Sequence, residues 1–401
     1  MKILHIQQFY FENWGYQENI LPYYHKKLGH DVTLITSTCL DKNNRYQQER
    51  EFFENNFKIK RINTIGQFKK RFVLFKDLYK LLEEEKPDYI FHHSVTSPSL
   101  KTICNYKKEH REVFIATDNH ADFDNSGKNK IWKYFYYNLF WKSFILKYDK
   151  YINVYFGVTP IRCLFLEKEL GITSEKIRLL PLGVDEDKAS VKLSKEEYYK
   201  KYNIDKDCFI VVHGGKITKE KQVDRILRAF SRIEDKNIRL ILFGTLEDPY
   251  VKSLIANDCR IKFIGWLNRE DTLSILKYSD VGVWNTQHTT LLEDCIAVDL
   301  PMILRYYGNT CHLIDNTGLY LYEGTIREIE DKISFLINNR DIVKVFKENI
   351  PYIRKLLSYD NIANESIEYS KNLNYLETHK KFMSLKYFDK NYKYLKRINR
   401  N

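Results

Sequence analysis

Short apolar runs alternate with stretches of helical periodicity, and this alternation occurs twice along the chain. The first series has apolar runs at residues 2–7, 31–37, 89–93, 113–117 and 151–158, and the second at 208–213, 239–243, 261–264, 281–284 and 302–304. Strands that alternate with helices are typical of βα units around a parallel sheet. A chain of 401 residues is also too long for a single core. The sequence therefore predicts an α/β fold with two Rossmann-like, doubly wound domains that face each other across a cleft.

A short apolar strand broken by proline and glycine marks the expected boundary between the two series. This run, LLPLGVD at residues 179–185, precedes a charged stretch at 186–202 that we interpret as a linker. We expect an N-terminal domain over 1–185 and a C-terminal domain over 186–355. Residues 356–401 are expected to supply a helix that returns to the first domain and a basic tail. Doubly wound folds bind ligands beyond the carboxyl ends of their strands, so the residues after each strand are the candidates for a site.

The charge balance favours anionic partners without choosing among them. The chain has 65 basic and 53 acidic side chains, a net charge of +12, which suits nucleotide phosphates, anionic lipid or nucleic acid. We expect no nucleic-acid partner, because no helix-turn-helix, RNA-recognition or zinc-module signature occurs. The seven cysteines are scattered without a CxxC pair and no HExxH motif is present, so we expect reduced thiols, a cytoplasmic location and no metal. No apolar run is long enough for a membrane-spanning helix, and the oligomeric state stays open.

The segment VVHGGKITKEKQ, at residues 211–222, combines the features of a phosphate-binding site. An apolar strand is expected to end in Gly214 and Gly215, Lys216 follows, and Lys221 comes where a helix is expected to begin. Glycines let backbone N–H groups approach a phosphate, and a helix start contributes partial positive charge. Two ammonium groups can neutralise a diphosphate. The same residues also fit an ordinary glycine turn with two solvated lysines.

This segment resembles the glycine–basic–x–x–x–Glu–Lys element of the family 4 retaining glycosyltransferases, which have the GT-B fold, at Gly215, Lys216, Glu220 and Lys221. Further segments in that family's order are 15–18, 28–32, 87–88, 181–185 and Gly265-Trp266-Leu267. The resemblance implies that Lys216 and Lys221 hold the diphosphate of a nucleotide-sugar donor and stabilise the leaving group. It also implies that Gly15 faces the phosphates and that the backbone at 265–267 contacts the donor base.

The expected donor-sugar loop departs from the family pattern. The family has two glutamates eight residues apart, and the second starts a helix and binds the donor ribose; Glu293 takes that place by resemblance. A carboxylate accepts two hydroxyl hydrogen bonds at once, although Glu293 also fits a helix-entry residue stabilised by the helix dipole. The first glutamate is absent, since Asn285 stands eight positions earlier. His288, Thr289 and Thr290 are the candidates to contact the sugar and the diphosphate in its place.

A second group of candidates follows the apolar run at 113–117. His120 resembles the family's pocket histidine, which lies near the donor sugar, and His93, at the end of the preceding run, is the second candidate for that role. Asp118 and Asp122 flank His120. They are candidates to act as bases or to orient His120, and they equally fit caps of the following turn.

The resemblance implies a sugar transfer that retains the anomeric configuration and needs no metal. Negative charge develops on the departing diphosphate, so fixed positive groups stabilise the transition state. The acceptor hydroxyl passes its proton to the leaving phosphate. A lipid-linked or polysaccharide glycan is the expected acceptor, as in assembly of bacterial capsule or lipopolysaccharide. The alternative is a catalytically inactive GT-B relative that acts as a scaffold or partner subunit, because the donor loop is altered.

Two segments suggest peripheral docking on an anionic membrane surface. Residues 128–150 mix lysines with aromatic side chains, and the tail at 379–401 has an apolar stripe flanked by basic residues. The pattern of the tail is typical of an interfacial amphipathic helix. The first also fits a helix packed on the sheet, and the second a frayed basic terminus.

Overall fold

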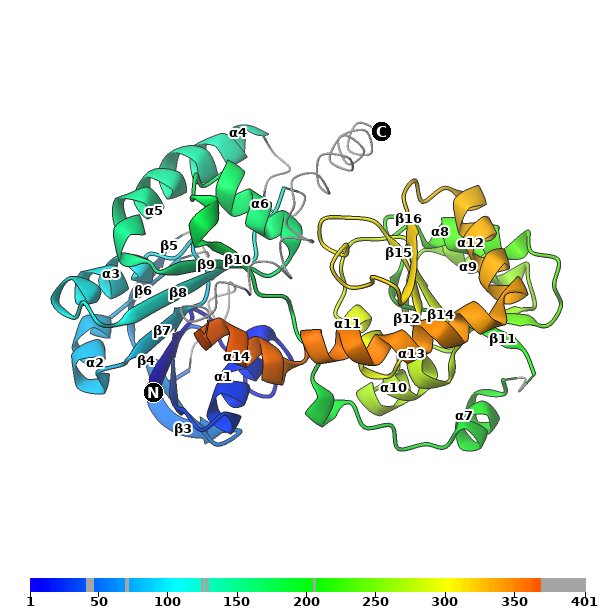
Figure 1. Cartoon of the computed structure of the whole chain (residues 1–401), viewed down its shortest axis with the longest axis horizontal. Coiled ribbons are helices and arrows are strands. Elements are labelled where there is room, and N and C mark those ends of the chain that lie inside the picture. Colours follow the sequence, from blue (N-terminus) through cyan, green and yellow to red (C-terminus); the bar gives the residue numbers. More distant parts are fainter. Residues whose placement is uncertain (41–46, 69–71, 124–125, 127–129, 205–206, 369–401) are drawn as a thin grey trace. The chain divides into compact units, whose positions relative to one another are not determined.

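The structure of the chain is a computed structural model that describes residues 1–40, 47–68, 72–123, 126, 130–204 and 207–368. It divides into two compact units (Figure 1). The N-terminal unit comprises Met1–Leu182 and the segment that begins at Tyr359, and the C-terminal unit is Gly183–Ser358. These limits lie close to the expected ones at 185 and 355. Each unit is an α/β domain built on a mainly parallel sheet, as the alternation predicts.

The N-terminal unit has an eight-stranded sheet with the order β10-β9-β8-β7-β1-β2-β4-β3. Its strands are β1 (Lys2–Ile6), β2 (Asp31–Ser37), β3 (Arg50–Glu54), β4 (Phe57–Ile62), β7 (Tyr89–His92), β8 (Phe114–Asn119), β9 (Val154–Gly157) and β10 (Ile177–Leu179). All neighbours are parallel except β3 and β4. A separate hairpin pairs β5 (Thr64–Phe68) with β6 (Phe72–Phe75). The central strands are buried on both faces because helices cover both faces.

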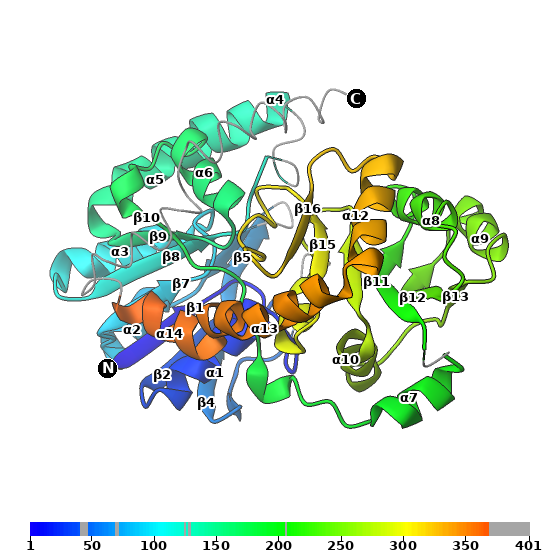
Figure 2. The same ribbon diagram turned by 45° about the vertical axis from the view of Figure 1, so that its right-hand side comes forward.

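Helices on the two sides of this sheet form separate cores (Figure 2). One face packs against α2 (Leu78–Glu85), α3 (Ser99–Glu109), the π-helix η1 (Tyr134–Trp141), α5 (Lys142–Tyr148) and α6 (Pro160–Lys168). The other packs against α1 (Gln17–Lys27) and α14 (Tyr359–Glu368), which contact each other. Side chains alternate along a strand, so Ile3 and His5 of β1 point to the α1–α14 face while Leu4 and Ile6 point away from it.

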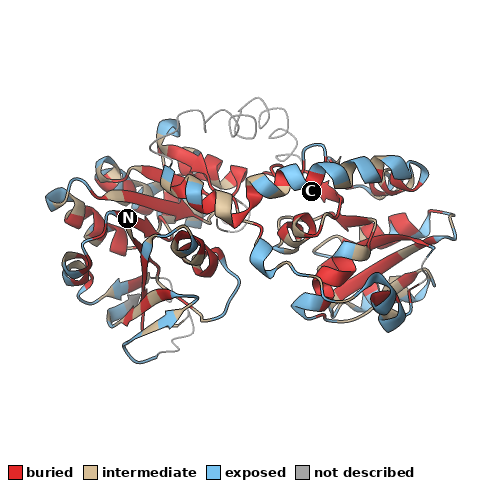
Figure 3. Cartoon of the chain, turned by 60° about the horizontal axis from the view of Figure 1, so that its bottom comes forward, coloured by how far each residue is buried: buried red, intermediate tan, exposed pale blue. Residues whose placement is uncertain are grey.

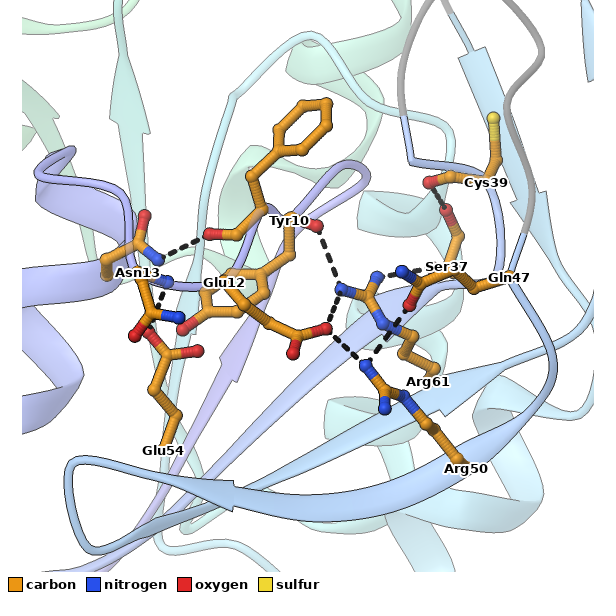
Figure 4. A network of polar contacts seen from close by, with 11 residues as sticks. Tyr10, Glu12, Asn13, Ser37, Cys39, Gln47, Arg50, Glu54 and Arg61 are labelled. Atoms are coloured by element: carbon orange, nitrogen blue, oxygen red, sulfur yellow. Dashed lines mark hydrogen bonds and ion pairs between the residues drawn. The ribbon is translucent and has the colours of Figure 1, made fainter.

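A buried arginine holds the loop between β1 and α1 in place (Figure 4). Arg61 of β4 donates to the carbonyl oxygens of Tyr10 and Ser37, at 3.0 and 3.3 Å. Its guanidinium also lies 3.3 Å from the carboxylate of Glu12, which pairs with Arg50 of β3 as well. These bonds join β3 and β4 to the loop, so the edge of the sheet supports the entrance to the first helix.

The C-terminal unit has a six-stranded, fully parallel sheet with the order β13-β12-β11-β14-β15-β16. Its strands are β11 (Phe209–Ile217), β12 (Ile238–Leu246), β13 (Ile261–Phe263), β14 (Val281–Trp284), β15 (Met302–Arg305) and β16 (Gly318–Leu321). One face packs against α7 (Lys195–Tyr202), α10 (Arg269–Tyr278), α11 (Leu291–Ala297) and α13 (Arg340–Leu357). The other packs against α8 (Val223–Ser231), α9 (Pro249–Ala256) and α12 (Ile326–Asn338). Figure 3 shows buried strands and exposed outer helix faces.

The stretch that we interpreted as a linker is partly helical, which corrects that expectation. Helix α7 begins with a capping box, in which the Ser194 hydroxyl accepts from the backbone of Glu197 and the Glu197 carboxylate accepts from the backbone of Ser194. Tyr198 and Tyr199 are buried in the core of the C-terminal unit. Residues 195–202 therefore belong to the fold of this unit and do not form a free connection.

Among the described residues, none of the helices combines the length and the apolar character that crossing a bilayer requires. The basic tail at 379–401 lies outside the described residues, so its expected amphipathic pattern stays a prediction.

Candidate functional site

Strand β11 continues through the two glycines to Ile217, which corrects the expected strand end at Gly214 and Gly215. Gly214 and Gly215 pair with Phe243 and Gly244 of β12. A side chain at Gly244 has no room, because its Cβ atom would lie 2.0 Å from the carbonyl oxygen of Gly215. Gly244 in turn donates its N–H to the carbonyl oxygen of Gly265, at 2.8 Å.

Three glycines with left-handed backbone conformations therefore lie next to one another at the carboxyl ends of neighbouring strands. Their φ angles are 117° at Gly215, 119° at Gly244 and 80° at Gly265. Only glycine adopts such angles without strain. The result is a surface of bare backbone, to which a flat or highly charged ligand can approach closely.

A pocket of about 300 Å³ opens at the end of β11. It is lined by His213, Gly214, Gly215, Lys216, Lys221, Trp284, Thr286, His288 and Thr289. These residues come from β11 and β14, which are neighbours in the sheet of the C-terminal unit, and from the loops that follow these two strands. Trp284 fixes the wall by donating its indole N–H to the carbonyl oxygen of Gly214, at 3.0 Å.

The two predicted lysines are the cationic side chains of this pocket. Lys216 is exposed and Lys221 half-buried, and neither forms an ion pair with the part of the chain that the structure describes. Helix α8 begins at Val223, so Lys221 lies in the turn before the helix and not in its first turn. Lys219 points elsewhere, since its ammonium lies 5.6 Å from the ring of Tyr250. The pocket therefore presents two unpaired ammonium groups to a ligand.

His213 contributes a neutral imidazole to the pocket. Its Nδ1 donates to the carbonyl oxygen of Val283, at 2.7 Å, so Nε2 carries a lone pair. Burial lowers the pKa of His213 to about 4, and this bond to Val283 opposes the shift only in part. His213 can thus accept a hydrogen bond near neutral pH and adds no positive charge. The sequence interpretation had not singled it out.

Glu293 and His288 form one buried pair, although we assigned them to different parts of the donor. His288 Nε2 lies 2.6 Å from Glu293 Oε1. The other oxygen, Oε2, is buried and has no hydrogen-bond partner among the described residues. A hydrogen on His288 Nε2 leaves Nδ1 as an acceptor unless the ring is protonated. Glu293 therefore keeps one unused acceptor, and His288 can donate to a phosphate only as the imidazolium.

The remaining C-terminal candidates lie outside the pocket lining. Thr290 is exposed at the start of α11, and Trp266 is exposed while Leu267 is buried. Asn285, at the position of the missing glutamate, is fully buried and donates to Gln222 and to the carbonyl oxygen of Gly324, at 2.9 and 3.0 Å. Asn285 thus ties β14 to the start of α8 and does not line the pocket.

In the N-terminal unit, Asp118 brings both candidate histidines together. Its Oδ2 lies 2.9 Å from His93 Nδ1 and 3.5 Å from His120 Nε2. Burial alone would raise the pKa of Asp118, but His120 and His93 hold it well below its usual range. Burial alone would lower the pKa of His120, but Asp118 and Glu18 raise it. The Nε2 edge of His120 is buried, although the side chain as a whole is over a third exposed.

The other N-terminal candidates have different surroundings. Asp122 is buried and pairs with Arg162 of α6, at 3.3 Å. Gly15 lies in the loop before α1, and a side chain added there would meet open space. Nothing in its backbone conformation requires glycine, since its φ angle is not positive.

Among the described residues, no three His, Cys, Asp or Glu side chains are grouped as a metal site requires. The metal independence of the reaction stays a prediction.

The sequence matches the models of two glycosyltransferase families. Residues 21–188 match Glycosyltransferase Family 4, and residues 194–351 match Glycosyl transferases group 1. An uncharacterized glycosyltransferase of Methanocaldococcus jannaschii is 25% identical over 248 residues, which are 58% of this chain and 59% of that protein. The capsular polysaccharide biosynthesis glycosyltransferase CapM of Staphylococcus aureus is 23% identical over 167 residues, 39% of this chain and 43% of CapM. The chain thus spans about half the length of these relatives.

The fold is similar to that of solved glycosyltransferase structures. Anabaena HepE, in a complex with UDP, aligns with a TM-score of 0.67 and 12% sequence identity over 93% of this chain and 100% of HepE. Identity this low establishes a shared fold and leaves the ligand of this chain to be argued from its own residues.

Proposed function

Because this chain belongs to the family 4 glycosyltransferases of the GT-B fold, we propose that it transfers a sugar from a nucleotide-diphosphate sugar to a hydroxyl group. We propose retention of configuration, no metal, and a glycan or lipid-linked acceptor. The observation that supports this proposal most is the pocket at the end of β11, where Lys216 and Lys221 stand unpaired beside bare glycine backbone. HepE, which has the same fold, binds UDP.

In the proposed reaction the protein acts mainly through fixed charge. The bond between the sugar and the diphosphate breaks, and negative charge grows on the departing oxygen. Lys216 and Lys221 interact more strongly with this charge than with the intact donor, so they lower the barrier. The acceptor hydroxyl passes its proton to the leaving phosphate, and His120 is the proposed contact of the transferred sugar.

Glu293 is the proposed ribose ligand, through its unused oxygen Oε2. The substitution Glu293→Gln keeps the shape but replaces one acceptor by an N–H donor. We expect the affinity for the matching nucleoside diphosphate to fall about 10–100-fold, because hydrogen bonds to a charged group contribute about 1.5–3 kcal/mol. Titration calorimetry with UDP and GDP measures this loss.

A nucleotide that lacks the ribose hydroxyls distinguishes two roles of Glu293, the binding of the ribose and the stabilisation of the start of α11. With the 2′,3′-dideoxy nucleotide, wild type and Glu293→Gln should bind almost equally. A loss that is the same for both nucleotides would show that Glu293 only stabilises the start of α11. Glu234→Gln is the control, because Glu234 is an exposed glutamate of the same unit that does not line the pocket.

We also propose that the N-terminal unit docks on an anionic membrane surface through the helix 130–148, which joins α4 (Lys130–Lys133) to η1 and α5. One face packs into the core through Tyr137, Trp141, Ile145 and Tyr148. The other face exposes Ile131, Trp132, Tyr134, Phe135, Leu139, Phe140 and Leu146. Exposed apolar groups of this extent mark an interaction surface. Lys147 is exposed beside them, which favours anionic lipid.

Flotation with liposomes tests this docking. The double variant Phe135→Ser and Phe140→Ser should lower binding to vesicles that contain phosphatidylglycerol about tenfold or more, because two large apolar side chains no longer enter the interface. Phe335→Ser is the matched control, an exposed phenylalanine of the C-terminal unit. Equal binding by the double variant and the control would exclude this surface.

A further inference from the structure

Three buried histidines form a continuous hydrogen-bonded chain in the N-terminal unit. His25 Nδ1 of α1 lies 2.9 Å from His5 Nε2 of β1. His5 Nδ1 lies 3.0 Å from Nε2 of His93, which follows β7. All three side chains are at most 4% exposed, so water does not compete for these bonds. A side chain that only fills the core needs no such series of ring-to-ring bonds.

The two ends of this imidazole chain have different chemistry. At one end His93 Nδ1 meets Oδ2 of Asp118, whose other oxygen accepts the backbone N–H of Ser94 at 2.6 Å. At the other end His25 Nε2 lies 2.8 Å from the hydroxyl oxygen of Ser366 in α14. That hydroxyl also lies 2.8 Å from the carbonyl oxygen of Ala363. The carboxylate of Asp118 can only accept, so His93 must donate a hydrogen to it. The hydroxyl of Ser366 can either donate to His25 or accept from it, so this end allows both tautomers of His25.

The alternation of side chains along β7 separates these three histidines from the neighbouring His92. His92 points to the opposite face, where it bonds to Ser99 Oγ at 2.8 Å and lies 3.4 Å from Thr117 Oγ1. His93 and Asp118 point to the α1–α14 face. The relay is therefore restricted to His25, His5 and His93.

Counting protons shows that this arrangement has two complete bonding patterns. In the neutral pattern each ring carries its hydrogen on Nδ1, and Ser366 donates to His25 Nε2. In the charged pattern each ring carries a hydrogen on Nε2, His93 keeps a second one on Nδ1 for Asp118, and Ser366 donates to Ala363. The patterns differ by one proton, and no heavy atom has to move between them.

The extra charge is best placed on His93. Burial, followed by the neighbouring His25 and His93, keeps the pKa of His5 well below its usual value. Burial and then His30 lower the pKa of His25 to about 3. Of these three histidines, His93 is the one in contact with the carboxylate of Asp118. A proton that enters at either end is therefore stabilised beside Asp118.

We propose that His25, His5 and His93 are positioning residues that form a proton relay from Ser366 to Asp118, and that the relay controls the charge of His120 through the shared carboxylate. When the relay is neutral, Asp118 is fully available to stabilise protonated His120. When His93 is charged, it neutralises Asp118 and His120 releases its proton more readily. Glu18, which favours the charge on His120, and Arg162, which opposes it, are the other charged groups that act on His120. The role of His120 in transfer rests on the proposed function, but its coupling to the relay does not.

Ser366→Ala in the full chain tests the relay at its far end. Without the hydroxyl, no donor to His25 Nε2 remains for the neutral pattern. In the charged pattern the ring can still donate to the backbone carbonyl of Ala363, a hydrogen bond that raises the pKa of His25, so the charged pattern becomes more favourable. We expect His120 to titrate at a lower pH than in wild type, by roughly half a unit or more, since the relay charge opposes its proton. NMR of protein labelled with ¹⁵N-histidine follows this titration and reports the tautomer of each ring. His25 and His5 should change from Nδ1–H to Nε2–H.

Ser99→Ala is the matched control, because Ser99 bonds an equally buried histidine that is outside the relay. It should leave the titration of His120 unchanged. The relay is excluded if both variants shift His120 alike, if neither does, or if His5 and His25 show mixed tautomers in wild type. Asp118→Asn should lower the pKa of His120 more than Ser366→Ala does, and failure of this order also contradicts the relay.

Activity then separates the relay from the proposed function. If His120 acts in transfer, Ser366→Ala should move the pH profile of kcat by the same amount as the NMR titration and leave its plateau unchanged. If the NMR shift occurs without a change in the profile, the relay stands and the role of His120 in transfer fails.

Discussion

Replacing Lys216 or Lys221 with alanine is expected to lower kcat/KM about a hundredfold, because loss of one electrostatic group at a leaving anion costs roughly 3 kcal/mol of barrier. Both ammonium groups line the same pocket, and neither has an acidic partner among the described residues. The double variant should lose less than the product of the single losses, since both groups act on one diphosphate. Initial rates of transfer, or of donor hydrolysis, with UDP-, GDP- and CMP-linked sugars measure the effect.

Lys219→Ala is the control for these two variants. Lys219 belongs to the same segment, but its ammonium lies over Tyr250 and it does not line the pocket. It should retain nearly full activity. Equal losses in all three variants would show that the segment contributes only general charge. A wild-type protein that binds a nucleotide diphosphate but neither transfers nor hydrolyses any of these sugars would support the alternative, an inactive GT-B relative that acts as a scaffold.

Gly244→Ala is expected to destabilise the C-terminal unit by about 2–5 kcal/mol, from a strained backbone and a steric clash together. The φ angle of 119° disfavours any residue with a Cβ atom. That atom would also lie 2.0 Å from the carbonyl oxygen of Gly215, and backbone cannot rotate away as a side chain does. Nucleotide affinity should fall as well, because β11 and β12 must separate next to Lys216. Scanning calorimetry and titration calorimetry measure the two effects.

Gly265→Ala isolates the cost of backbone strain. Gly265 has a φ angle of 80°, but an added Cβ atom meets nothing within 4 Å. We expect a loss of about 1 kcal/mol, as for a residue forced into a left-handed conformation. If Gly244→Ala is no more destabilising than Gly265→Ala, the close approach of β11 and β12 is not a requirement of this unit.

The regular elements of this protein were predictable from local pattern. The runs at 31–37 and 281–284 coincide with β2 and β14, because a strand covered by helices on both faces must be largely apolar. The antiparallel edge strand β3 was missed, because polar and apolar residues mix along it. Helix α7 was missed because Tyr198 and Tyr199 become core residues only through contact with the rest of the C-terminal unit.

The candidate site, too, has features that the sequence determined and features that only the tertiary structure decided. The sequence by itself determined that Lys216, Lys221 and Glu293 lie close to strand ends or helix starts, because their chemistry and spacing are local properties. Only the tertiary structure decided that β11 continues through Gly215, that His288 bonds to Glu293, and that Asp118 contacts His120. His25 and Ser366 are 341 positions apart, and the packing of α14 on α1 brings them together. Such contacts depend on which elements become neighbours, and no local period in a sequence records that.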